Sequence, residues 1–133
     1  MAKIGVIGAG SWGIALSALL SNNGHDVKVW SIIEEEIKML SEHHEHKDKL
    51  PGVILSDKIT FTTDLKEAVE GMDLLVMAVP SPFVRKTAAD MKGFVSEGQI
   101  IVNVAKGIEE TTLMTLSQII EEEVPQAEVT VLS

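Results

Sequence analysis

The sequence predicts an α/β protein with a doubly wound, mostly parallel sheet, and two observations support this fold class. Short apolar runs alternate along the whole chain with segments whose apolar residues have helical spacing. The run 73–79 is also apolar nearly throughout, which is typical of a central parallel strand covered on both faces. Because parallel neighbours need crossover connections, this alternation predicts helices packed on a single sheet. The 133 residues suffice for one domain, 1–133.

The predicted strands are short apolar runs bounded by turn residues or polar segments. Glycines follow the first run directly, and Pro80 ends the fourth. Strands are expected at 3–7, 27–30, 59–62, 73–79, 100–104 and 129–132.

The predicted helices have an apolar face and recognisable ends. Asp64 and Glu67 have the spacing of a capping box at the start of the third helix. Ser81 followed by Pro82 is a typical N-cap and first-turn pair for the fourth. The first helix is expected from the glycine turn to Asn23-Gly24, and the others at 34–40, 64–69, 81–91 and 113–123.

The segment Gly8-Ala9-Gly10-Ser11-Trp12-Gly13 joins the first strand to the first helix, as in sites that bind a dinucleotide pyrophosphate. In such a site Gly8 allows a tight turn, Gly10 lets the backbone approach the phosphates, and Gly13 lets the helix pack closely. The N–H groups at the helix N-terminus then face the anion. A glycine turn without a ligand is the alternative, and the complete βαβ unit that follows makes it the weaker one.

Composition excludes several classes of protein. A net charge of −9 argues against a nucleic-acid partner, since phosphate backbones need clustered Lys and Arg. The chain has no cysteine, which removes disulfides and thiolate chemistry and suits the reducing cytoplasm, where we expect the protein. No run approaches the ~18 apolar residues of a membrane span. Because the net charge is negative, the long-range field of the protein does not attract an anionic ligand, which must be captured locally by helix termini and a few lysines.

Six short motifs carry a resemblance that covers the whole chain. They are the glycine turn, Asn23-Gly24-His25, Leu50-Pro51-Gly52, Val79-Pro80-Ser81, Lys106-Gly107 and Val131-Leu132-Ser133. In this order they resemble the amino-terminal domain of NAD(P)-dependent glycerol-3-phosphate dehydrogenase. The resemblance implies a Rossmann-like fold, NAD or NADP as cofactor, and reversible hydride transfer to dihydroxyacetone phosphate, giving sn-glycerol 3-phosphate for phospholipid synthesis. It also implies a helical carboxyl-terminal domain, so we expect a truncated chain that turns over substrate poorly or not at all.

The resemblance assigns roles to individual residues. Lys106 matches a family lysine that contacts substrate and cofactor, and it is the expected catalytic residue. Without the resemblance, Lys106 and Lys49 are surface lysines, Ser11 is a helix cap and Trp12 a core indole. Ser81 is then an N-cap, and Phe83 packs in a first turn. Trp12 can serve both as a core indole and as the cofactor contact that the resemblance implies. The expected cofactor-binding residues are Gly8, Gly10, Ser11, Trp12, Gly13, Ser31, Ile32, Lys49, Ser81, Phe83 and Lys106.

The choice between NAD and NADP depends on the end of the second strand. NAD enzymes place an acidic residue there for the adenosine ribose, and NADP enzymes place an arginine nearby. Here Ser31 holds that place and Ile32 follows, whereas the acids Glu34, Glu35 and Glu36 come later. Neither signal is where it should be, so use of both cofactors is expected.

Three histidines, His43, His44 and His46, raise the hypothesis of a shared metal ion. No cysteine or paired carboxylate frames them, so a polar loop without a metal is the preferred interpretation. Two other functions stay open: another dehydrogenase with a similar amino-terminal fold, disfavoured by the Leu-Pro-Gly and Lys-Gly motifs, and a non-catalytic module that senses NAD(P). An apolar face left by a missing domain would favour self-association, and a homodimer is a further expectation.

Overall fold

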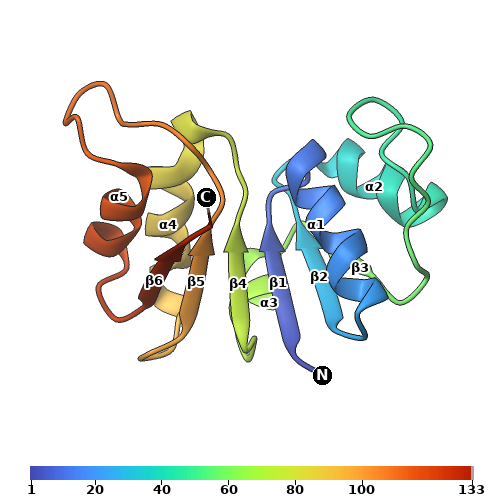
Figure 1. Cartoon of the computed structure of the whole chain (residues 1–133), viewed down its shortest axis with the longest axis horizontal. Helices are drawn as coiled ribbons and strands as arrows, with labels where there is room; N and C mark the ends of the chain where they lie inside the picture. The colour runs from blue at the N-terminus through green and yellow to red at the C-terminus, as the bar shows by residue number, and fades with distance from the viewer. Residues whose placement is uncertain (133) are drawn as a thin grey trace.

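The computed structural model describes residues 1–132, and its strands form one parallel sheet in the order β3-β2-β1-β4-β5-β6 (Figure 1). The expected doubly wound parallel sheet is therefore confirmed. The strands are β1 (Lys3–Ile7), β2 (Asp26–Trp30), β3 (Thr60–Thr62), β4 (Leu74–Met77), β5 (Ile100–Asn103) and β6 (Glu128–Val131).

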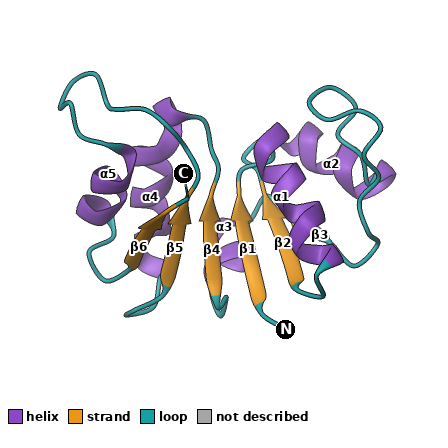
Figure 2. Ribbon diagram, in the orientation of Figure 1, coloured by secondary structure: helices purple, strands orange, loops and turns teal. Residues whose placement is uncertain are grey.

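Helices cover both faces of the sheet (Figure 2). Residues of α1 and α2 pack in one apolar core, and residues of α3, α4 and α5 pack in the other. The helices are α1 (Ser11–Asn22), α2 (Glu34–His43), α3 (Leu65–Val69), α4 (Val84–Met91) and α5 (Leu116–Glu123), with 3₁₀ turns η1 (Ser81–Phe83) and η2 (Lys92–Phe94).

The central strand β4 contributes to both cores, because successive side chains of a strand point to opposite faces. Leu75 and Met77 are fully buried on the side of α3 to α5, and Val76 is buried on the side of α1. This explains why the run that contains β4 is apolar nearly throughout. The strand itself is shorter than the expected 73–79.

The third helix begins at Leu65 with Asp64 as its N-cap, but the capping box expected between Asp64 and Glu67 does not form. The Asp64 side chain accepts a hydrogen bond from the Lys66 N–H at 3.0 Å. The Thr62 hydroxyl, not Glu67, accepts the N–H of Asp64, at 2.9 Å. Glu67 instead accepts hydrogen bonds from Lys28 Nζ at 2.6 Å and Thr62 Oγ1 at 3.0 Å, so its carboxylate links α3 to strands β2 and β3.

Two other helix starts differ from expectation. Ser81 is not an N-cap, because Ser81–Phe83 forms a 3₁₀ turn whose N-cap, Pro80, makes no side-chain cap, and α4 begins at Val84. The last helix begins at Leu116 and not at Leu113, since Leu113 has a left-handed φ of 61°. A complete capping box between Thr115 and Gln118 marks its real start.

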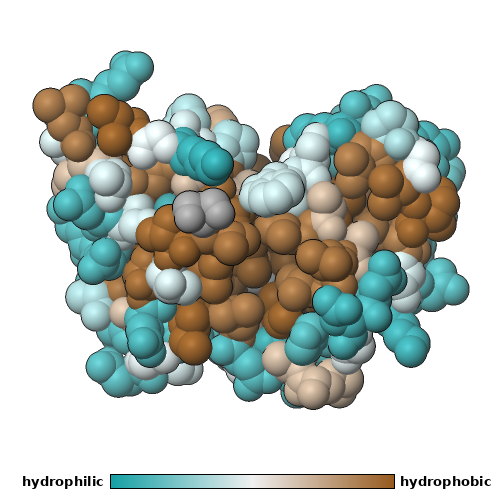
Figure 3. All heavy atoms as spheres, viewed as in Figure 1, coloured by the Kyte–Doolittle hydropathy of each residue, from teal (hydrophilic) through white to brown (hydrophobic). Residues whose placement is uncertain are grey.

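One face of the sheet is covered unevenly. Helices α1 and α2 contact β1, β2 and β3, whereas Figure 3 shows apolar side chains gathered at the surface beside them. Ile100 of β5 is 38% exposed, and because side chains alternate along a strand it faces the opposite side of the sheet from the fully buried Ile101. Among residues 1–132, no helix is both long enough and apolar enough to cross a membrane.

Candidate functional site

The turn between β1 and α1 lies at the carboxyl edge of the sheet, where β1 pairs with both β2 and β4. Strands β2 and β3 lie on one side of β1, and β4, β5 and β6 lie on the other, so the strand order reverses at β1. Ligands of open α/β sheets bind at such a switch point. The Gly8 N–H donates to the Trp30 carbonyl at 2.9 Å, and Gly8 has a φ of 125°. A Cβ at Gly8 would lie 2.7 Å from the Ala78 backbone, so a larger residue has no room.

The other two glycines of the turn differ from one another. A Cβ at Gly13 would lie 2.4 Å from the Gly8 carbonyl oxygen, so Gly13 lets α1 pack against the turn. A Cβ at Gly10 would meet no protein atom within 4 Å, so the backbone there borders open space that a side chain would fill. Gly10 is the N-cap of α1, with no side-chain cap and no acid in the first turn. The turn therefore fits a phosphate group bound by the N–H groups of the helix N-terminus.

Ser11 and Trp12 open helix α1 in ways that differ from their predicted structural roles. Ser11 does not cap the helix, since its hydroxyl donates to the Lys49 carbonyl at 2.6 Å. This bond ties the loop after α2 to the glycine turn. Trp12 is 56% exposed, so the interpretation as a core indole was wrong. Its indole stands on the first turn of α1, where it is available to a ligand.

A buried charge network lies at the carboxyl end of β2. The Ser31 hydroxyl donates to Glu36 Oε1 at 2.7 Å, while Glu36 Oε2 lies 2.8 Å from both Lys49 Nζ and His46 Nε2. Burial raises the pKa of Glu36, but the hydrogen bonds from Lys49, His46 and Ser31 together lower it by more than burial raises it. The pKa of Glu36 therefore lies below its ordinary value. Glu36 is therefore ionised at neutral pH.

Sequence reasoning missed the role of Glu36 in this network. The residue lies one helical turn before the fully buried Leu40, and this spacing places both on the inner face of α2. Ile32, by contrast, is 71% exposed beside Ser31, which is itself buried. The Ser31 hydroxyl could donate a hydrogen bond to a ligand only if its bond to Glu36 broke.

The loops after β4 and β5 meet at the same edge. Lys106 is exposed in the loop after β5 and takes part in no ion pair within residues 1–132. The next residue, Gly107, has a φ of 121°, and a Cβ built on it would lie 4.0 Å from the Ser81 Cβ. The structure thus brings Ser81 beside the Lys106-Gly107 motif. Phe83 is 57% exposed, so the alternative interpretation, in which it packs in a first turn, is wrong.

A cavity of about 330 Å³ lies next to this motif. Its walls come from the first turn after β4 and from the loop that follows Lys106. The residues that line it are Ser81, Pro82, Ile108, Glu109, Glu110 and Thr111.

The three neighbouring histidines do not converge. His46 is buried against Glu36, whereas His43 is exposed and its Nε2 lies 4.0 Å from Glu42. His44 packs edge-on against Phe61, with ring centroids 5.6 Å apart. In the described part of the chain, no three or more His, Asp or Glu side chains are grouped so that they could hold a metal ion.

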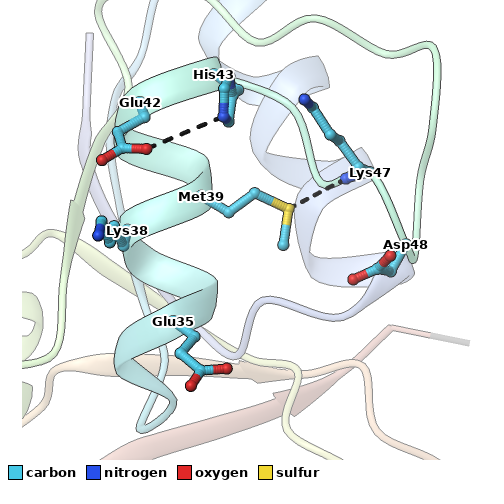
Figure 4. A pocket seen from close by; sticks show the side chains of 7 residues that line it. All are labelled: Glu35, Lys38, Met39, Glu42, His43, Lys47 and Asp48. Atoms are coloured by element: carbon cyan, nitrogen blue, oxygen red, sulfur yellow. Dashed lines mark hydrogen bonds and ion pairs between the residues drawn. The ribbon is translucent and has the colours of Figure 1, made fainter.

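A second hollow, of about 350 Å³, lies on the outer side of α2 (Figure 4). Figure 4 shows its lysine and acidic side chains around Met39, whose sulfur accepts the Lys47 N–H at 3.3 Å. None of the predicted site residues lines it. We therefore place the candidate site at the carboxyl edge of the sheet and not in this hollow.

Comparison with known proteins gives a family match over nearly the whole chain. The family described as NAD-dependent glycerol-3-phosphate dehydrogenase N-terminus matches residues 3–133. A glycerol-3-phosphate dehydrogenase [NAD(P)+] of Agathobacter rectalis is 63% identical over 132 residues, which are 99% of this chain and 39% of the relative. The chain thus spans about two fifths of that relative's length.

Solved structures of the same enzyme share the fold. The glycerol-3-phosphate dehydrogenase of Coxiella burnetii superposes with a TM-score of 0.91 and 25% identity, over 98% of this chain and 40% of that one. The enzyme of Saccharomyces cerevisiae superposes with a TM-score of 0.87 and 26% identity, over 98% of this chain and 41% of that one. The family match, the close bacterial relative and the shared fold lead to one conclusion: this chain belongs to the family of NAD-dependent glycerol-3-phosphate dehydrogenase amino-terminal domains.

Proposed function

We propose that the chain binds NAD(H) or NADP(H) and takes part in hydride transfer between the nicotinamide and dihydroxyacetone phosphate, giving sn-glycerol 3-phosphate. The observation that carries this proposal is the open space beside Gly10, at a helix N-terminus with no capping side chain. Such a terminus at a switch point suits a pyrophosphate. The substrate follows from the named activity of the relatives, which are longer than this chain.

The residues at the carboxyl edge have distinct roles in this proposal. The cofactor, when bound, supplies or accepts the hydride. Gly8 and Gly13 shape the turn, while the N–H groups that follow Gly10 donate to the phosphates. Ser31, Ile32 and Lys49 border the adenosine ribose, Ser11 and Trp12 line the pyrophosphate, and Ser81 and Phe83 flank the nicotinamide.

Lys106 is the proposed catalytic residue of this segment. Its ammonium group is exposed at the edge where the loops after β4 and β5 meet. Negative charge develops on the substrate carbonyl oxygen during reduction, and Lys106 Nζ stabilises that charge and donates a proton to the oxygen. The substrate phosphate needs a further cationic anchor. We propose that this anchor comes from a part of the enzyme that the chain does not include, and that the chain alone is nearly inactive.

We propose further that the complete enzyme works in the cytoplasm, supplies phospholipid synthesis and forms a homodimer. The dimer is supported by the exposed apolar side chains beside α1. Sedimentation of the full-length enzyme at several concentrations tests the dimer; a single monomeric species throughout would contradict it.

Calorimetric titration of the chain with NADH and NADPH tests the nucleotide site. We expect saturable binding, and we expect Gly10→Ala to weaken it by about tenfold or more, because a methyl group would occupy the space of the phosphates. The substitution should leave the unfolding temperature unchanged, since no protein atom lies within 4 Å of the added Cβ. Gly93→Ala is the matched control, because Gly93 also borders open space but lies in η2. No heat with either nucleotide would overturn the proposal.

A further inference from the structure

Glu36 is a buried carboxylate that lies beside the end of β2, at the carboxyl edge of the sheet where we place the nucleotide. It lies in the first turn of α2 and is 7% exposed. One carboxylate oxygen binds the Ser31 hydroxyl, and the other binds Lys49 Nζ and His46 Nε2. The Ser31 hydroxyl oxygen also accepts the Ile33 N–H at 3.1 Å. Both the donor and an acceptor position of Ser31 are therefore occupied within the protein.

Lys49 spans the region between the glycine turn and the end of β2. Its backbone carbonyl accepts the Ser11 hydroxyl at the start of α1, and its ammonium group reaches the carboxylate that binds Ser31. In a site of this fold the adenosine ribose lies between these two points. The Lys49 side chain is 42% exposed, so it borders that space.

The positive charge of Lys49 is nevertheless neutralised by Glu36. A 2′-phosphate on the ribose adds about two negative charges and calls for an unpaired cation, usually arginine. The single arginine of this sequence, Arg85, lies on α4 and binds three carboxylates. Lys47, the lysine nearest to Lys49 in the sequence, lines the hollow on the outer side of α2. A ribose 2′-hydroxyl, by contrast, needs no cation.

We propose that Glu36 determines the cofactor preference of this chain, by neutralising Lys49 and turning the Ser31 hydroxyl inward, so that NAD(H) binds more tightly than NADP(H). The proposal rests on the nucleotide site proposed above. The expectation that both cofactors are used came from the absence of an acid and an arginine directly after β2. In this proposal Glu36 is the acid that favours NAD(H) over NADP(H), but it lies on α2 and acts by neutralising Lys49.

The ratio of the dissociation constants of NADPH and NADH tests this proposal. We expect the wild-type chain to bind NADH at least about tenfold more tightly, and Glu36→Gln to reduce the ratio about tenfold by freeing Lys49 for the 2′-phosphate. Adding Lys49→Gln to that variant should restore the ratio, since the freed cation is then removed. Glu35→Gln on the exposed side of α2 and Lys47→Gln in the same loop are matched controls, for which no change in the ratio is expected.

A second measurement needs no variant. Without an unpaired cation at the ribose, the 2′-phosphate is repelled by the acids of α2. Added salt screens this repulsion, so the dissociation constant of NADPH should fall relative to that of NADH between about 0.02 and 0.2 M salt. A ratio that rises with salt, a preference for NADPH, or an unchanged ratio in a folded Glu36→Gln variant would each overturn the inference. Absence of binding by both nucleotides would instead overturn the nucleotide site itself.

Discussion

Arg85 and Glu109 form a two-point ion pair. Arg85 Nε donates to Glu109 Oε2 at 2.7 Å and Nη2 donates to Oε1 at 2.8 Å. Nη1 of the same guanidinium donates to Glu122 at 2.7 Å and to Glu123 at 2.5 Å, both on α5. Because Glu109 lies three residues after Lys106 in the loop that follows β5, one side chain of α4 fixes this loop to two helices.

Removal of this guanidinium should loosen the loop. We expect Arg85→Met to speed amide hydrogen exchange in residues 106–113 by about tenfold or more, while exchange in β1 stays slow. Lys86→Met is the control, because Lys86 binds only Asp90 on its own helix in the described structure. Hydrogen exchange followed by mass spectrometry measures both regions. Equal protection of the loop in Arg85→Met and wild type would contradict this account.

The same ion pair predicts how stability depends on pH. Hydrogen bonds from Arg85 and Thr112 lower the pKa of Glu109 from 4.5 to about 2. A carboxyl whose pKa is lower in the folded state stabilises that state above about pH 4.5 and loses its contribution as the pH falls toward 2. The lowered pKa values of Glu36 and Glu67 act in the same direction.

The difference in unfolding free energy between the wild type and Glu109→Gln should therefore be greatest at neutral pH. It should shrink between about pH 5 and 2, as the Glu109 carboxylate takes up its proton. Urea titrations across this range measure the difference. Glu110→Gln is the control, because it removes the same charge from the same loop and leaves the bonds between Arg85 and Glu109 in place. A difference that widens on acidification would show that the sign is wrong.

Glycine substitutions in the turn should separate folding from binding. Gly8→Ala places a Cβ 2.7 Å from the Ala78 backbone at a φ of 125°, so we expect a loss of about 2 kcal/mol or more in unfolding free energy. Gly10→Ala, at a φ of −73°, should cost no more than a few tenths of a kcal/mol. Urea unfolding compares the two variants. Similar stability losses at both positions would contradict the described turn.

The two tryptophans should report nucleotide binding differently. Trp12 is 56% exposed beside the glycine turn, whereas Trp30 is 6% exposed and its Nε1 donates to the Thr63 carbonyl at 3.0 Å. We expect NAD⁺ to quench Trp12 fluorescence and leave that of Trp30 nearly constant. Trp12→Phe should therefore lose most of the signal change. A full change in that variant would place the nucleotide elsewhere.

The chain alone should oxidise NADH with dihydroxyacetone phosphate only slowly, although it binds the nucleotide. Lys106 is the only cation that we assign to the substrate, and a bound phosphate needs further charged donors. A spectrophotometric assay at 340 nm on the chain and on a full-length relative compares the two turnover rates. Equal rates would show that the chain holds a complete active site.

The sequence by itself determined the order of the elements and the place of the glycine turn. These follow from local patterns, because a run such as 3–7 is apolar enough to form a buried strand wherever it lies, and Gly8 permits a backbone angle that other residues rarely adopt. The family resemblance added the roles expected of Lys106 and its partners. Local patterns also erred, at Ser81 and at Leu113, where the true helix starts depend on 3₁₀ and left-handed turns.

The tertiary structure alone decided which side chains meet at the site. Ser31, Glu36, His46 and Lys49 lie in three different segments, and only the path of the loop after α2 brings them to one carboxylate. The exposure of Trp12 was decided in the same way, by how α1 packs on the sheet. Hydrophobic periodicity specifies which face of a helix is buried. It carries no information on the partner that a buried charge finds across the fold, because that partner is chosen by three-dimensional proximity.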